Sequence, residues 1–93
     1  MRNAAPRWIK VVRHLSRFDP EGMTFIAPSG VVQEAIAEAL GITRANVALV
    51  LGRMRERGLV ECRLLHVVGF NRRKKVYVLS QAGFVAWGEL RAQ

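Results

Sequence analysis

The chain has 93 residues, 51% of them apolar, so its length and composition suit one small domain over residues 1–93 and exclude two. A membrane span is excluded because no run of about 18 apolar residues occurs, and the N-terminus lacks the apolar core of a signal peptide, which predicts a cytoplasmic protein. The net charge of +8 is concentrated in residues 41–79, which hold nine basic and two acidic residues, and this indicates a nucleic-acid surface unless it only keeps the protein soluble.

The first predicted element is a helix that begins at Pro6 and ends within the sequence FDPEG, residues 18–22. Proline suits the first position of a helix, whereas Pro20 cannot continue one. The apolar residues of this helix have the spacing of a single stripe: Trp8, Val11, Val12, Leu15 and Phe18. His14 lies near the basic side of the helix, where we expect it to be solvated. Residues 23–27 are short and β-prone, and predict a small strand.

Two further helices are predicted on either side of Gly41. Residues 28–41 form the first of them, with Ser29 as its N-cap. Residues 44–57 form the second, with Thr43 as its N-cap and Gly58 as its left-handed C-terminal stop. The buried face of the second helix is predicted from its apolar spacing to consist of Val47, Val50, Leu51 and Met54.

A hairpin and a last helix complete the chain. Residues 59–68 and 75–79 are the predicted strands, and Ser80 is the predicted cap of the last helix. Four cations, Arg72 to Lys75, are expected at the hairpin tip. The more apolar face of the first strand is predicted from its even positions: Val60, Cys62, Leu64 and Val68. His66, on the same face, is predicted to be a hydrogen-bonded structural histidine.

The helices around Gly41 have the features of a helix-turn-helix motif. Ala37 is small where the second helix must cross, and Gly41 allows the positive φ of the turn. The required spacing is met at seven positions: Ile36, Ala37, Leu40, Gly41, Ile42, Val47 and Val50. Together with the hairpin, this order predicts an α+β, mostly helical, winged helix-turn-helix fold with a three-helix core, a small strand, a two-stranded wing hairpin and a C-terminal helix.

Two stretches resemble the MarR-like type of winged helix-turn-helix protein, which is common among bacterial and archaeal regulators. IAEALGITRANVALVLGRMRERGLVE, residues 36–61, is similar to the helix pair and the start of the wing in that family. RRKKVYVLSQAG, residues 72–83, is similar to the return strand of the wing and to the Leu-Thr-x-x-Gly that follows, with Ser80 in place of the threonine. The resemblance covers roughly residues 24–83.

The resemblance implies a DNA-binding transcriptional regulator whose partner is double-stranded DNA. Residues 44–57 would be a recognition helix in the major groove, and residues 69–75 a basic wing on the backbone or in the minor groove. The residues expected to contact DNA are Thr43, Arg44, Ala45, Asn46, Ala48, Leu49, Arg53, Arg72, Arg73, Lys74 and Lys75. Cations on a wing can neutralise phosphates or enter a narrow minor groove, although a merely solvated turn is the alternative.

The outer face of the predicted recognition helix departs from the family pattern. Many relatives carry Ser-Arg where this chain has Ala48-Leu49. Ala45 and Gly52 share this face, which therefore offers few donors and acceptors for reading base edges. Two alternatives to a sequence-selective regulator stay open: a winged-helix module that binds proteins, and a non-specific chromosomal DNA-binding protein, which would be nucleoid-associated.

The two terminal helices carry a heavy apolar load for so short a chain: Trp8, Phe84, Trp87 and Leu90. We predict that these residues form a homodimer interface, with a close helix–helix crossing at Gly88, while packing of the two helices within one monomer is the alternative. No catalytic set, cofactor site, metal site or small-molecule site emerges, so we do not expect an enzyme. Cys62, the single cysteine, is expected to be a small buried hydrophobe.

Overall fold

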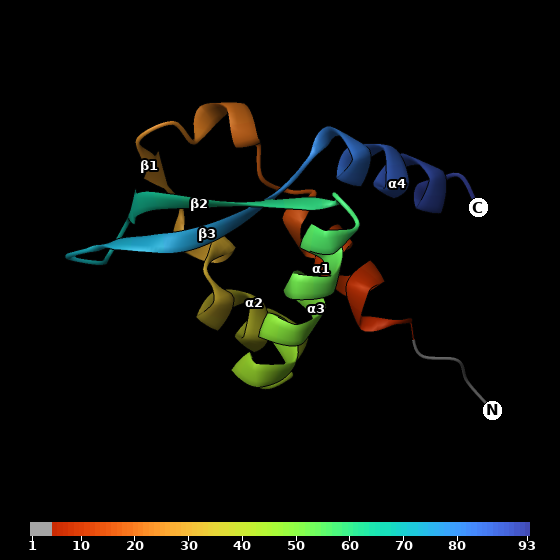
Figure 1. The fold of residues 1–93 in the computed structure, drawn as a ribbon, viewed down its shortest axis with the longest axis horizontal. Helices are drawn as coiled ribbons and strands as arrows, with labels where there is room; N and C mark the ends of the chain where they lie inside the picture. The colour runs from red at the N-terminus through yellow and green to blue at the C-terminus, as the bar shows by residue number, and fades with distance from the viewer. Residues whose placement is uncertain (1–4) are drawn as a thin grey trace.

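Four α-helices and a three-stranded sheet make up residues 5–93, the part of the chain that the computed structural model describes (Figure 1). The elements in chain order are α1 (Arg7–Leu15), the 3-10 turn η1 (Pro20–Gly22), β1 (Ile26–Ala27), the 3-10 turn η2 (Ser29–Val31), α2 (Gln33–Leu40), α3 (Arg44–Glu56), β2 (Val60–Val67), β3 (Arg73–Leu79) and α4 (Gln81–Arg91). This order confirms the predicted α+β, mostly helical, winged helix-turn-helix fold.

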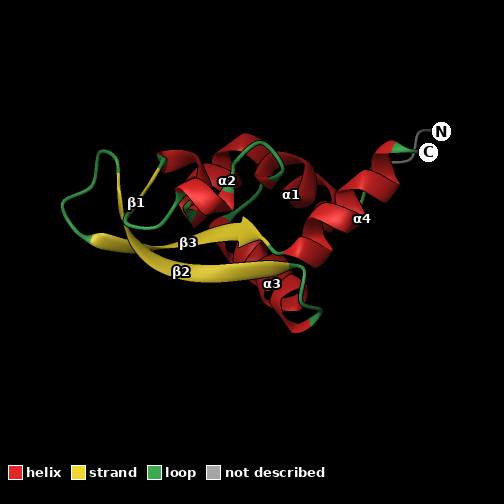
Figure 2. Ribbon diagram, turned by 90° about the horizontal axis from the view of Figure 1, so that it is seen from above, coloured by secondary structure: helices red, strands yellow, loops and turns green. Residues whose placement is uncertain are grey.

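The sheet has the strand order β1-β2-β3, and its longer part is the predicted hairpin (Figure 2). β2 and β3 are antiparallel, and their pairing runs from Val60 opposite Leu79 to His66 opposite Arg73. β1 is parallel to β2 and contributes only two residues. The hairpin projects past the helices at its outer end, and this projection is the wing (Figure 1).

The core lies between the helices and the sheet. Its buried residues come from every α-helix before β2 and from all three strands: Val11, Val12, Leu15, Met23, Ala27, Val31, Val32, Ile36, Ala37, Val47, Leu51, Met54, Val60, Val67, Val76, Tyr77, Val78 and Leu79. Full burial of a side chain such as Leu15 or Ile36 contributes about 1.5–3 kcal/mol. The predicted stripe of α1 is confirmed at its centre, whereas Trp8 and Phe18 at its two ends are only half-buried.

The turn between α2 and α3 has the predicted geometry. Gly41 takes a left-handed conformation with φ of 69°, and the N–H of Ile42 donates to the carbonyl of Ala37 across the turn at 3.1 Å. The bend between the two helices is 108°, within the range of helix-turn-helix motifs. No single helix in residues 5–93 has the length and apolar composition to span a membrane; α2 and α3 meet that criterion only when counted together across their bend.

The predicted start of α2 was wrong. Ser29 belongs to η2 instead of capping a helix, and α2 begins only at Gln33. Val31 and Val32 are both buried, and Val32 is extended, with φ of −88° and ψ of 157°. Val32 forms a bridge with Val76 of β3, which requires an extended backbone, and α2 starts after it without a side-chain cap among the described residues.

The more apolar face of β2 is buried only near the start of the strand. Val60 is buried and Cys62 is half-buried, but Leu64 is 58% and Val68 60% exposed. This face of the hairpin is therefore open to solvent over its outer half. His66 lies on the open part and is exposed rather than a hydrogen-bonded structural histidine.

His14 also differs from its prediction. It is half-buried, and its Nε2 lies 2.8 Å from the carbonyl oxygen of Gly30. Its ring also stands 5.5 Å from that of Phe18, measured between centroids. His14 therefore links α1 to the chain segment before α2 and is not simply solvated.

Candidate nucleic-acid interface

The outer face of α3 is exposed, as predicted. Because Val47, Leu51 and Met54 point into the core, the opposite side of the helix faces solvent. The residues that share this exposed side are Ala45, Ala48, Leu49, Gly52 and, at the C-terminal end of the helix, Glu56. The N-terminus of α3 is fixed by Thr43, whose Oγ1 accepts a hydrogen bond from the N–H of Asn46 at 3.1 Å, which confirms the predicted cap.

Arginines flank this face on both sides. Arg53 and Arg57 lie on the flank that faces α1, where they line a cavity with Trp8. Arg55 is also exposed, and the period of the helix places it on the opposite flank from Arg53 and Arg57. The small side chains of the strip allow a polyanion to approach α3 closely, and the arginines on the two flanks attract its negative charge.

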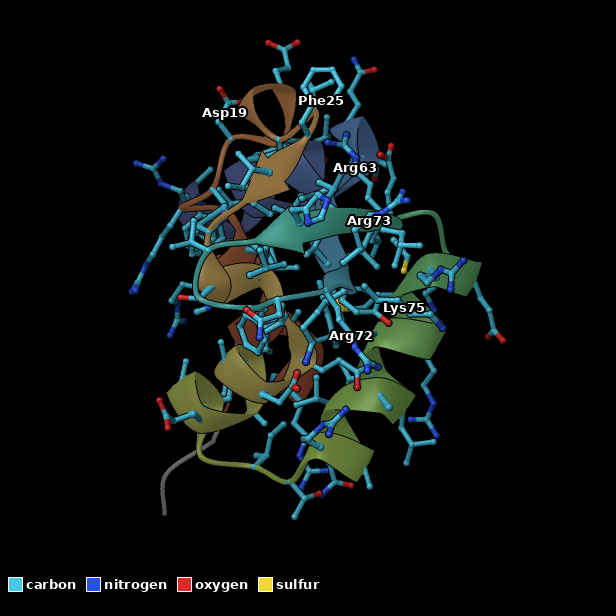
Figure 3. All side chains as sticks on the ribbon, turned by 90° about the vertical axis from the view of Figure 1, so that its left-hand side faces the viewer. Asp19, Phe25, Arg63, Arg72, Arg73 and Lys75 are labelled. Atoms are coloured by element: carbon cyan, nitrogen blue, oxygen red, sulfur yellow. The ribbon has the colours of Figure 1, made fainter. Side chains whose placement is uncertain are left out.

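The wing carries its cations differently from the prediction. Only Arg72 lies in the turn, residues 68–72, whereas Arg73, Lys74 and Lys75 belong to β3. Gly69 takes the left-handed conformation that this turn needs, with φ of 88°. In Figure 3, Arg72 and Lys75 lie on the side of the hairpin toward α3, while Arg73 lies nearer to Arg63.

Lys74 faces away from Arg73 and Lys75, its two neighbours on β3, because side chains alternate along a strand. Its Nζ is 2.7 Å from Oε2 of Glu34, in the first turn of α2, and 4.5 Å from the centroid of the Phe70 ring. Arg72, Arg73 and Lys75 are exposed, whereas Lys74 is half-buried. The hydrogen bond from Lys74, with Arg44 assisting, lowers the pKa of Glu34.

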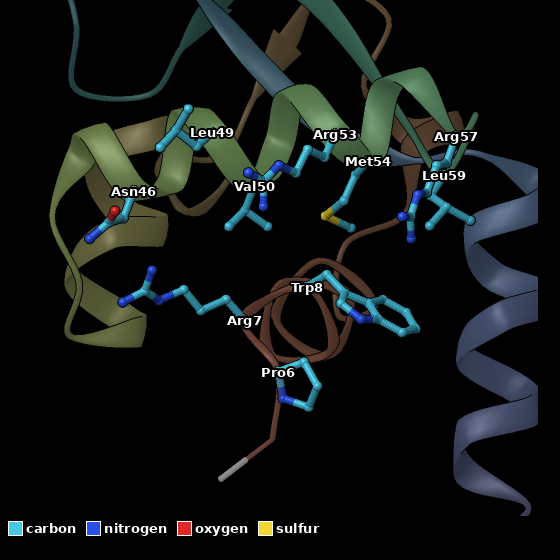
Figure 4. A pocket seen from close by; sticks show the side chains of 10 residues that line it. All are labelled: Pro6, Arg7, Trp8, Asn46, Leu49, Val50, Arg53, Met54, Arg57 and Leu59. Carbon is cyan, nitrogen blue, oxygen red and sulfur yellow. The ribbon is translucent and has the colours of Figure 1, made fainter.

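A cavity of about 470 Å³ lies between α1 and α3, and it was not predicted from the sequence (Figure 4). Trp8 and Met54 form part of its apolar wall, and three arginines give it positive charge. Its lining consists of Pro6, Arg7, Trp8, Asn46, Leu49, Val50, Arg53, Met54, Arg57 and Leu59. Val50, which was predicted to be buried, is half-buried because its side chain borders this cavity. Within residues 5–93, no group of three or more His, Cys, Asp or Glu side chains could hold a metal ion.

Arg63 was not singled out from the sequence, yet it fixes the segment that leads to β1. Its Nη1 donates to the carbonyl oxygens of Pro20 at 2.7 Å and Met23 at 3.1 Å, and its Nη2 is 3.3 Å from Oε1 of Glu61. No sequence signal could have revealed these contacts, because an arginine in a strand looks the same in the sequence whether its side chain binds backbone carbonyls or solvent. Arg63 therefore has a structural partner within the chain.

Part of the apolar surface of the two terminal helices is buried within the chain. The residues predicted to form a dimer interface are half-buried against the core: Trp8, Phe84, Trp87 and Leu90. Gly88 is exposed, and among the described residues nothing lies within 4 Å of the position a Cβ would take. The close approach in this region is at Gly83 instead, where a Cβ would collide with the carbonyl oxygen of Leu59. The dimer stays a prediction.

The helix pair with its exposed second helix, together with the projecting hairpin, defines a winged helix-turn-helix protein. By sequence, the chain matches no model of a known protein family and no curated protein. Its structure is similar to the MepR–DNA complex of S. aureus, with 18% identity and a TM-score of 0.73 over 95% of this chain and 62% of that one.

Two other solved structures are similar. CouR of Rhodococcus jostii RHA1 bound to p-coumaroyl-CoA has 20% identity and a TM-score of 0.71, over 96% of this chain and 54% of that one. The transcriptional regulator PA3341 has 24% identity and a TM-score of 0.66, over 92% and 53%. The chain therefore spans little more than half of the length of these proteins. The likeness confirms the predicted MarR-like winged-helix fold.

Proposed function

We propose that the chain is a DNA-binding transcriptional regulator that inserts α3 into the major groove and lays its wing on the backbone or in the minor groove. The observation that carries the proposal is the exposed strip of α3 with arginines on both flanks and a basic hairpin beside it. The similarity to a fold solved in complex with DNA supports it. A regulator of this kind acts in the compartment that holds the chromosome.

The proposed reading of DNA depends on the first turn of α3. In helix-turn-helix proteins this end of the second helix reaches the base edges, and here it carries Arg44 and Asn46, which can pair with guanine and adenine. Ala45 and Leu49 can contact thymine methyl groups but cannot donate or accept hydrogen bonds. Few positions are therefore available for direct readout, and the phosphate contacts of the flanks and wing would supply most of the affinity.

Selection of bound sequences from random duplex DNA tests the proposal. We expect an enriched site that the protein binds at least about 10³-fold more tightly than random DNA. Arg44→Ala should then weaken binding to that site by roughly 1–3 kcal/mol and relax its sequence preference. Tight binding without enrichment would favour a non-specific chromosomal protein, and no DNA binding at moderate salt would favour a protein-binding module.

The cavity favours a second, compatible function, control by a small molecule. We propose an anionic aromatic ligand, because apolar walls at Trp8 and Met54 stand beside three arginines. Asn46, Leu49 and Arg53 line the cavity and also belong to the proposed DNA surface, so occupancy should compete with DNA. The similarity to CouR, solved with p-coumaroyl-CoA, supports this class of ligand.

Titration with p-coumarate and p-coumaroyl-CoA tests the ligand proposal. Binding should quench the fluorescence of Trp8 and weaken the DNA complex. Arg7→Gln should reduce the affinity for the ligand and change DNA binding less, whereas Arg91→Gln, which removes an equal charge from α4, should leave ligand affinity unchanged. Equal effects of these two variants, or no binding by the wild type, would refute an anion site in the cavity.

A further inference from the structure

The start of α2 is attached along the outer edge of β3. Val32 forms an isolated antiparallel bridge with Val76. Next to it, Nε2 of Gln33 donates to Oη of Tyr77 at 3.1 Å. These two contacts fix the base of the hairpin to the helix-turn-helix unit, because α2 continues directly into the turn before α3.

The ion pair between Lys74 and Glu34 is the outermost of these attachments. Glu34 is the residue after Gln33, and Lys74 lies one residue from the end of the paired strand. The ammonium is held from two sides, since it also lies over the ring of Phe70 in the wing turn. Both side chains are partly screened from solvent, at 28% exposed for Lys74 and 39% for Glu34.

We propose that Lys74 is a positioning residue: it holds the wing at a fixed direction relative to α3 and does not itself contact DNA. This inference rests on the proposed function and assigns different roles to adjacent cations. To reach a phosphate, Lys74 would have to leave Glu34, whereas Arg73 and Lys75 project from the opposite face of the strand and are exposed. We call this ion pair the brace, because it joins β3 of the wing to α2, which leads through the turn at Gly41 into α3.

Amide hydrogen exchange in the DNA-free protein tests the brace directly. Lys74→Gln and Glu34→Gln should each accelerate exchange in the outer half of the hairpin, residues 64–75, by about two- to fivefold, the factor expected for a partly exposed ion pair. The double variant should exchange no faster than either single variant, since both remove the same contact. Arg73→Gln, the matched loss of one neighbouring charge, should leave exchange unchanged.

DNA binding tests the division of roles. In a series of salt concentrations, Arg73→Gln should reduce the slope of log affinity against log salt by about 0.9, the value for one lost phosphate contact. Lys74→Gln should weaken binding by about two- to fivefold without changing the slope, and Lys74→Arg should restore wild-type affinity. A slope that falls equally in Lys74→Gln and Arg73→Gln, with unchanged hydrogen exchange in the former, would overturn the inference.

The two measurements separate this inference from the proposed function. If the wild type binds no DNA, the regulator proposal fails, but the exchange rates still show whether Lys74 and Glu34 hold the wing. If exchange in residues 64–75 is the same in the wild type and both single variants, the brace is refuted whatever the protein binds.

Discussion

Thr43 is a residue whose structural and proposed functional roles can be separated. Its hydroxyl caps α3, and its exposed position borders the proposed DNA surface. We expect Thr43→Ala to lower the free energy of unfolding by about 1 kcal/mol, because the N–H of Asn46 loses its partner. Urea denaturation measures this. Thr24→Ala, at another exposed threonine, should change stability by less than about 0.5 kcal/mol; similar losses in both variants would contradict the cap.

Glu34 gives the protein a predictable response to acid. Its hydrogen bond from Lys74 lowers its pKa in the folded state from 4.5, the ordinary value. A lowered carboxyl pKa stabilises the fold at pH values above 4.5, and this contribution is lost as the pH falls through the folded-state pKa. The wild type should therefore be more stable than Glu34→Gln at pH 7 and lose that advantage below pH 4.5. Unfolding curves at several pH values measure it, and a constant difference would contradict the ion pair.

Two glycines inside helices allow the roles of α3 and α4 to be compared. Gly52 and Gly88 are both exposed, and at neither position would a Cβ meet another atom of the described chain within 4 Å. Alanine at either site should raise stability by roughly 0.5–1 kcal/mol, because glycine weakens a helix interior. Gly83→Ala, the control, should destabilise the fold, since its Cβ would collide with Leu59.

The functional effects of these stabilising substitutions should differ. On the proposed function, Gly52→Ala should weaken DNA binding without affecting self-association, because a Cβ would be added to the surface that approaches the groove. Gly88→Ala should weaken self-association without affecting binding of a single chain to DNA. Thermal unfolding measures stability, DNA titration measures DNA binding, and sedimentation measures self-association. If both variants gain stability and neither loses DNA binding or self-association, neither glycine has a role at an interface.

The elements that could be predicted from the sequence are those whose signals are local. Gly41, Thr43 and Ser80 act through their own turn or helix end, and the structure confirms all three. The role of Ser29 and the burial of Leu64 depend on distant segments: the predicted cap at Ser29 was wrong, and the apolar face of β2 did not show that Leu64 is exposed. In the candidate site, the exposed face of α3 could be predicted from helical periodicity. The ion pair of Lys74 could not, because its partner Glu34 lies 40 residues away in the sequence.

At the scale of the whole molecule, α4 is the element most suited to contact a second copy. The described chain measures 45 × 26 × 21 Å, and α4 extends from the body at the end opposite the wing (Figure 1). Trp87 and Leu90 are only half-buried, and Val85 is 57% exposed. Association through α4 would leave two recognition helices free to read a palindromic site.

We expect sedimentation to show a dimer at micromolar concentrations. Trp87→Ala should shift the equilibrium toward monomer, and Val85→Lys should do so without touching the core, because it adds a charge to an exposed apolar surface. A wild type that stays monomeric at high micromolar concentration without DNA would contradict the dimer and leave Trp8 and Trp87 as residues that pack within one chain.

The uncapped start of α2 also determines when this helix can be completed during folding. Its stabilising partners Tyr77 and Lys74 follow it by 44 and 40 residues, so α1, α2 and α3 all leave the ribosome before the strand that secures the first turn of α2. We expect that turn to stay frayed until β3 joins, late in folding. Gln33→Ala should then accelerate unfolding and leave the refolding rate nearly unchanged in stopped-flow experiments, whereas slower refolding would place this contact in the folding nucleus.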